Sequence, residues 1–220
     1  MKKLLLMIIV LLVSGTVMAQ GSKGKMTPKS FLAFHLGPSF PTGDFKSIDA
    51  NNEKAGYAKT GFNMNLNYGY KFTKNVGLTV GTYYNRYNID KKDLSQILPG
   101  TNVDHWQFFG IAVGPMLTHE FSSKVTGDLR IMGGMTYANS PLFSYEGTVL
   151  VKDDWKLTPM FQGGLDLRFN AGRNVFLMAN ADYMYLQPEF KFETTTGELV
   201  DKRHQTISVM NLTGGVGIKF

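Results

Sequence analysis

The sequence predicts an all-β protein, an eight-stranded antiparallel up-and-down transmembrane β-barrel. Three observations predict it: residue polarity alternates with period two along eight segments, the segments recur as a repeated pair, and short connections alternate with long ones. Residues 210–220 illustrate the alternation, because every second residue is apolar or glycine and those between are small or polar. Eleven residues are about the length that a tilted strand needs to cross a bilayer core.

The expected strands cover residues 30–37, 61–72, 76–84, 109–121, 125–137, 155–169, 175–185 and 210–220. The first is expected to end at Pro38, because Pro38, Pro41 and the residues up to Asp44 are turn formers. Asparagines at alternate positions of the second strand require one wet face. Pro115 and Pro159 each remove a ladder hydrogen bond and are expected to mark bulges or bends.

A phenylalanine ends every even-numbered strand, which makes the chain close to a hairpin used four times: Phe72, Phe121, Phe169 and Phe220. The connections after the first three of these are short turns, whereas all other connections are long. The pattern predicts short periplasmic turns and long extracellular loops. Aromatic girdles are expected at both bilayer interfaces, the second formed by Tyr84, Tyr137, Trp155 and Tyr185.

A soluble barrel with an apolar interior shows the same alternation. The membrane interpretation is favoured because the polar face is rich in small residues, as a narrow lumen requires. The aromatic rims and the unequal connections favour it as well, since neither has a reason to exist in water.

The N-terminus has the pattern of a secretory signal peptide over residues 1–19, with cleavage between Ala19 and Gln20. A retained membrane anchor is the alternative. Residues 20–29 are expected to be a flexible periplasmic linker, and residues 30–220 form the barrel. There is no cysteine, and the net charge falls from +6 to +4 when Lys2 and Lys3 leave, so neither disulfides nor a nucleic-acid partner is expected.

Eight charged residues occupy expected inward positions: Lys71, Glu120, Asp128, Arg130, Asp166, Arg168, Asp182 and Lys219. Because buried charges must be paired, we expect them to form a salt-bridge plug near the periplasmic end. A charge-lined conductance path is the alternative. An eight-stranded interior is only wide enough for its own side chains, which favours the plug.

No arrangement of residues predicts catalysis, a metal site or a cofactor. His35 is expected to face the lumen in a structural role, whereas His105 and His204 lie in or near loops. His119 faces outward and is therefore separated from Glu120. The long loops carry aromatic residues suited to recognition, although the loops could equally shield the barrel: Tyr57, Phe143, Tyr145, Phe190 and Phe192.

These patterns resemble the bacterial eight-stranded outer-membrane barrels of the OmpA transmembrane domain and OmpX class. The segment from Gly37 to Phe45 is similar to outer-membrane barrel domains of the Bacteroidetes, within the wider porin family. The resemblance implies a monomer in outer-membrane lipid and lipopolysaccharide, inserted by the outer-membrane assembly machinery, with Phe220 carrying the insertion signal. It implies a structural, adhesion or surface-recognition role; a narrow pore or secretion accessory and a lipid-modifying enzyme remain alternatives.

Overall fold

A computed structural model describes residues 28–49, 51–52, 54–90, 101–141, 143–145, 148–151, 155–193 and 199–220. The expected signal peptide, its cleavage point between Ala19 and Gln20, and most of the expected linker lie outside these residues.

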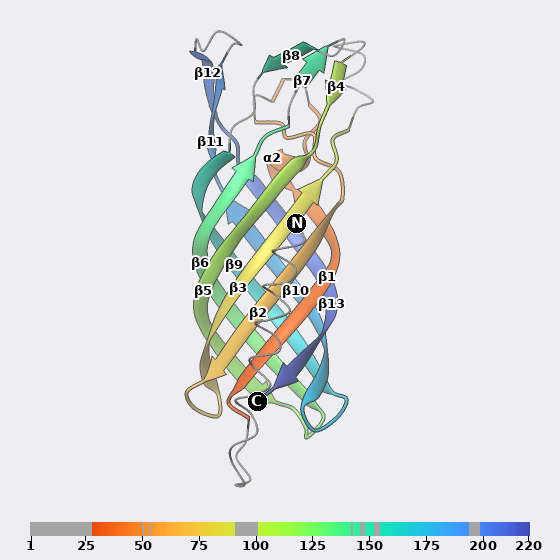
Figure 1. Cartoon of the computed structure of the whole chain (residues 1–220), viewed down its shortest axis with the longest axis vertical. Coiled ribbons are helices and arrows are strands. Elements are labelled where there is room, and N and C mark those ends of the chain that lie inside the picture. Colours follow the sequence, from red (N-terminus) through yellow and green to blue (C-terminus); the bar gives the residue numbers. More distant parts are fainter. Residues whose placement is uncertain are drawn as a thin grey trace.

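Eight antiparallel strands close into a barrel, so the predicted fold class is confirmed (Figure 1). Around the wall the order is β1, β13, β10, β9, β6, β5, β3 and β2, so each strand lies beside its sequence neighbours in the barrel and the last barrel strand closes on the first. The strands are β1 (Ser30–Thr42), β2 (Gly61–Lys71), β3 (Val76–Tyr87), β5 (Trp106–Glu120), β6 (Val125–Asn139), β9 (Trp155–Asn170), β10 (Val175–Leu186) and β13 (Ile207–Lys219).

The smaller elements gather at one end of the barrel, opposite the short turns (Figure 1). A one-turn helix, α2 (Gly43–Lys46), follows β1. Above the rim stand a three-stranded sheet of β4 (Thr101–Val103), β7 (Phe143–Tyr145) and β8 (Thr148–Val151), and a hairpin of β11 (Glu189–Glu193) and β12 (Leu199–His204). Among the described residues, no helix has the length and hydropathy needed to span a membrane.

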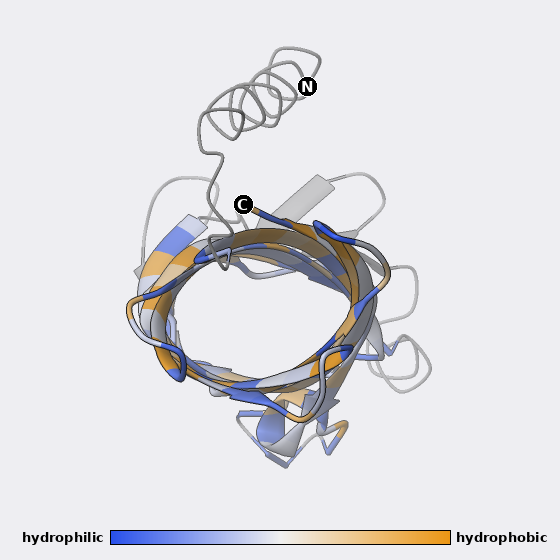
Figure 2. Ribbon diagram, turned by 90° about the horizontal axis from the view of Figure 1, so that it is seen from below, coloured by the Kyte–Doolittle hydropathy of each residue, from blue (hydrophilic) through white to orange (hydrophobic). Residues whose placement is uncertain are grey.

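The two faces of the wall differ in chemistry in the expected direction. Large apolar side chains stand exposed on the outside, for example Ile131 at 65% and Phe161 at 67% exposure, while polar residues such as Asn63 and Asn211 are buried inside. Seen from the short-turn end, hydrophobic and hydrophilic residues are intermixed around the closed wall (Figure 2). A bilayer explains this inverted distribution, because exposed apolar surface of this extent is unfavourable in water.

The prolines disturb the sheet less than the sequence suggested. β1 does not end before Pro38; it continues through Pro41 to Thr42, because Pro38 stays paired with Phe62 of β2 while only its pairing with β13 lapses. The register shows no bulge at Pro115 or Pro159, although the β5–β6 pairing lapses at Gly114 and Pro115. The β5–β6 register is the same on both sides of Pro115, and the β6–β9 register runs unbroken through Pro159. A closed wall lets one neighbouring strand hold the register where the other loses a hydrogen bond.

Candidate functional site

Two arginine–aspartate pairs cross the lumen wall between β6 and β9. Asp128 and Asp166 lie directly opposite each other in the register, which places two like charges side by side. Each carboxylate is bound by the arginine two residues along on the other strand. Arg130 reaches Asp166 at 2.6 Å (Nε–Oδ2) and 2.9 Å (Nη2–Oδ1), and Arg168 reaches Asp128 at 2.6 and 2.8 Å through the same atoms. We call these four residues the crossed pairs.

The crossed pairs are buried and supported by further contacts. All four residues are at most 3% exposed, and Thr118 donates its hydroxyl to Asp128 at 2.6 Å. The guanidinium of Arg168 lies 4.3 Å from the ring centroid of Phe31 and 5.6 Å from that of Phe176, within cation–π range. Each pair combines one hydrogen bond from Nη2 with a short Nε–Oδ2 ion-pair contact, and such contacts offset part of the desolvation cost of buried opposite charges.

The other four charged residues expected in the lumen are arranged differently. Lys71 lies 3.7 Å from Glu120 at the short-turn rim. Lys219 donates to the side-chain oxygen of Asn170, and Asp182 accepts from Asn211 at 2.7 Å. The register explains the difference, since Asp182 lies opposite Asn211, well above the rim where Lys219 lies. An amide, rather than a cation, therefore meets Asp182.

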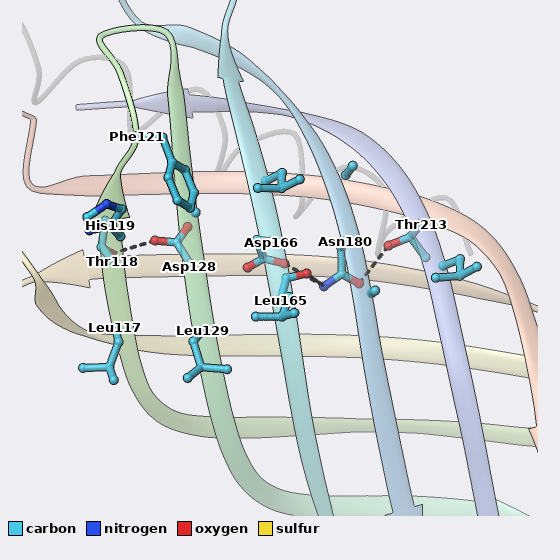
Figure 3. Close-up of a pocket in the computed structure, with 15 residues that line it drawn as sticks. Leu117, Thr118, His119, Phe121, Asp128, Leu129, Leu165, Asp166, Asn180 and Thr213 are labelled. Atoms are coloured by element: carbon cyan, nitrogen blue, oxygen red, sulfur yellow. Dashed lines mark hydrogen bonds between the residues drawn. The ribbon is translucent and has the colours of Figure 1, made fainter.

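A directional chain of hydrogen bonds connects His35 to the crossed pairs. Asn67 can only donate through Nδ2, so His35 accepts at Nε2 (2.8 Å) and carries its proton on Nδ1, which faces Thr213 Oγ1 at 2.7 Å. Thr213 in turn donates to Asn180 Oδ1 at 3.0 Å, and Asn180 donates to Asp166 at 2.6 Å (Figure 3). His35 thus has the structural role expected for it, and both ring nitrogens are occupied.

An aromatic cluster fills the interior at the loop end, and sequence analysis missed it. Phe45 of α2 is fully buried, with its ring centroid 5.3 Å from Tyr87, 5.5 Å from Trp106 and 5.8 Å from Phe108. Phe190 of β11 packs on Trp106 at 5.7 Å. We call these five residues the mouth cluster. Trp106 also donates its indole N–H to the Gly56 carbonyl at 3.0 Å, which ties the first loop to it.

The alternation itself could have revealed part of the mouth cluster. Trp106 and Phe108 have the same inward parity as the buried Ala112, but the expected strand began only at Phe109. The interpretation of Phe190 as a surface recognition residue is wrong, because it is 3% exposed and packs inside. Tyr57 is partly buried against the same core. The side chains of Phe143, Tyr145 and Phe192 lie outside the described residues.

A hollow in the described part of the wall is lined mainly by outward-facing apolar residues. It has a volume of about 850 Å³ and spans β5, β6, β9, β10 and β13 (Figure 3). Small residues create it, because Gly127 and Ala179 occupy outward positions in the row that begins at His119. His119 stands outside against the ring of Phe121, at 4.8 Å, while Asp128 and Asp166 belong to the interior.

The remaining predicted residues lie apart from the lumen. The phenylalanines at the short-turn end are all exposed: Phe72 58%, Phe121 64%, Phe169 43% and Phe220 40%. At the loop end His105 contacts Arg86 at 3.2 Å, and partial burial lowers the pKa of His105 below its ordinary value although Asp104 opposes the shift. His204 lies 3.4 Å from Glu189. Among the described residues, no group of histidine and acidic side chains could hold a metal ion.

Solved structures share this fold. The chain is similar to Ail, the attachment invasion locus protein of Yersinia pestis, with 19% identity and a TM-score of 0.53 over 89% of this chain and 100% of that chain. It is also similar to Neisserial surface protein A (15%, 0.54, covering 87% and 97%) and to a major outer membrane protein from Thermus thermophilus (9%, 0.54, covering 88% and 100%). No family model matches the chain, and no curated protein matches it.

Proposed function

We propose that this bacterial outer-membrane β-barrel acts by recognition or adhesion through its extracellular loops, with a closed lumen and without catalysis. The observation that carries the proposal is the presence of two buried layers of side chains inside the barrel. The mouth cluster fills the loop end with aromatic rings, and the crossed pairs fill the half nearer the short turns. With both levels occupied, the loops are the surface left for a partner.

The loop end is built to present such a surface. The β4–β7–β8 sheet and the β11–β12 hairpin have hydrogen-bonded frames of their own, and Phe190 fixes the base of the hairpin in the mouth cluster. Loops positioned by a rigid scaffold are common sites of recognition. The similar fold of Ail, which is called an attachment invasion locus protein and has been seen with a heparin analogue, gives an example of this use of the fold.

Lipid and lipopolysaccharide around the wall, and the outer-membrane assembly machinery during insertion, are the further partners that we propose. We propose a monomer, because the eight strands of the wall close on themselves and the wall has no edge strand to pair with another copy.

Excision of the hairpin tip tests the recognition role. Lys191 pairs with Lys202, so residues 192–201 can be replaced by Asn-Gly, a dipeptide that forms tight hairpin turns, while Phe190 is kept. Cells displaying the excised protein should lose adhesion to heparin-coated surfaces that the intact protein supports, and unchanged adhesion would contradict the recognition role of this hairpin. The control variant Ile48→Ala changes an exposed residue of the first loop without shortening any loop, and it should keep the adhesion.

Conductance tests the closed lumen. Purified protein in planar bilayers should give no steady channels, and steady ion-selective channels would favour the alternative of a narrow pore. A change in the mass of lipid A on overproduction would favour the alternative of a lipid-modifying enzyme instead.

A further inference from the structure

The short-turn end of the barrel is strongly cationic. Between the crossed pairs and the end of the wall, the described residues include six cations: Lys29, Lys71, Lys74, Lys124, Arg173 and Lys219. Among the described side chains of the same region, Glu120 is the one carboxylate. Each of the three short turns contributes one of these cations, namely Lys74, Lys124 and Arg173.

Among the residues that the structure describes, the loop end does not share this bias. There acids and bases alternate, as in the first loop, where Asp44 and Asp49 accompany Lys46, and in the 3.2 Å pair between Lys59 and Asp90. The excess of positive charge is therefore specific to the end where the turns lie, which in an outer-membrane barrel is the periplasmic end.

Three of the cations surround a cleft at the end of the β2–β3 hairpin. The cleft has a volume of about 400 Å³ and is lined by Lys29, Lys71, Phe72, Thr73, Lys74 and Glu120. The amide of Lys71 donates to the carbonyl of Lys29 at 2.7 Å, which fixes the backbones of these two lysines side by side. The side chain of Lys71 is 14% exposed and pairs with Glu120 at 3.7 Å, so this carboxylate competes for it.

The position of the cleft along the membrane normal indicates which anion it binds. Phe72 is 58% exposed on the outer face, and aromatic rings at a barrel rim lie at the level of lipid headgroups. The cleft therefore borders the phosphates of the periplasmic leaflet, with an apolar wall at Phe72 for the first acyl carbons and lysines for the charge. A free phosphate would make no use of the apolar wall.

We infer that this cleft binds the headgroup of an anionic phospholipid of the periplasmic leaflet, with Lys29, Lys71 and Lys74 supplying the positive charge. The inference rests on the orientation of the barrel in the outer membrane and not on the recognition role of the loops.

Binding of phosphatidylglycerol to the full chain, folded in a neutral detergent, tests the inference by native mass spectrometry. The double variant Lys29→Gln/Lys74→Gln should weaken binding by about 25-fold, since each lysine near a membrane surface contributes roughly fivefold. The matched control Lys124→Gln/Arg173→Gln removes the same charge from the same end but outside the cleft, and its loss should be only a few-fold. Equal losses in the two variants would overturn the cleft, and so would equal binding of phosphatidylcholine by the unmodified protein.

The variant Glu120→Gln should change the affinity for phosphatidylglycerol in the opposite direction to the lysine variants. Removal of the carboxylate releases Lys71, so phosphatidylglycerol should bind severalfold more tightly; unchanged or weaker binding contradicts the proposal. Inorganic phosphate in large excess should displace little of the lipid, and full displacement would overturn the assignment to a lipid. Retention on isolated peptidoglycan that only the Lys29→Gln/Lys74→Gln variant loses, with lipid binding intact, would overturn it as well. Heat-modifiable mobility on a gel checks that every variant is folded.

Discussion

The Nδ1 atom of His35 on β1 and the Oγ1 atom of Thr213 on β13 lie 2.7 Å apart, across the seam where the barrel closes. Because Thr213 also donates to Asn180, this one hydroxyl joins β1 to β10 through β13. The bond therefore connects the first barrel strand to the crossed pairs.

Replacement of this hydroxyl should weaken the closure. Thr213→Val leaves the Nδ1–H of His35 and the Oδ1 of Asn180 without a partner, and a buried unsatisfied group costs about 1–3 kcal/mol. The urea midpoint of unfolding in lipid vesicles should fall accordingly, while Thr213→Ser, which keeps the hydroxyl, should stay close to the unmodified protein. A Val variant as stable as the Ser variant would show that the chain of bonds does not support the seam.

Loss of one member of a crossed pair should cost more than loss of both. Arg130→Met leaves Asp166 buried with Asn180 as its remaining partner, and an uncompensated buried charge costs about 3–5 kcal/mol. Arg130→Met combined with Asp166→Leu removes both charges, so most of the free energy of unfolding should return. The free energies of unfolding of the two variants are compared by denaturation under identical conditions. A double variant that is less stable than the single variant contradicts the expectation.

Truncation of Phe45 should open the mouth cluster. Its buried ring contacts three aromatic neighbours. Replacement of a core Phe by Ala costs about 3–5 kcal/mol of stability, and we expect this loss to loosen mainly the first loop, which carries Phe45. In a Trp155→Phe background, where Trp106 is the single tryptophan, Phe45→Ala should shift the emission of Trp106 to longer wavelength as water enters. Ile48→Ala, at an exposed position of the same loop, should leave the emission unchanged.

Variants of Phe121 and Phe220 should distinguish a role in packing from a role in membrane insertion. The ring of Phe121 covers Gly127, where an added Cβ would lie 2.7 Å from it, whereas Phe220 touches Tyr68 at a ring distance of 6.2 Å. Because Phe121 is 64% exposed and Phe220 is 40% exposed, packing alone predicts that Phe121→Ala and Phe220→Ala destabilise the folded barrel by comparable amounts. If Phe220 carries the insertion signal, its deletion or replacement should nevertheless reduce the fraction inserted in cells far more than Phe121→Ala. Equal inserted fractions would make Phe220 one girdle aromatic among four.

The sequence by itself determined the barrel. Alternation with period two is a local property of a strand, so the eight strands and the inward position of residues such as Arg130 and Asp166 followed from counting along the chain. The outward face could be assigned as well, because exposed aromatic rims and unequal connections have a physical reason only in a bilayer.

The tertiary structure alone decided which side chains meet. The pairing of Arg130 with Asp166, and not with Asp128 on its own strand, follows from the register between β6 and β9, which no single strand encodes. The amide partner of Asp182 and the burial of Phe45 from a loop helix are long-range contacts of the same kind. Pro38 likewise stays inside β1 because it remains paired with Phe62 of β2. The alternation along a strand decides whether a side chain points inward or outward. Which inward side chains contact each other depends on the register between strands of the closed barrel.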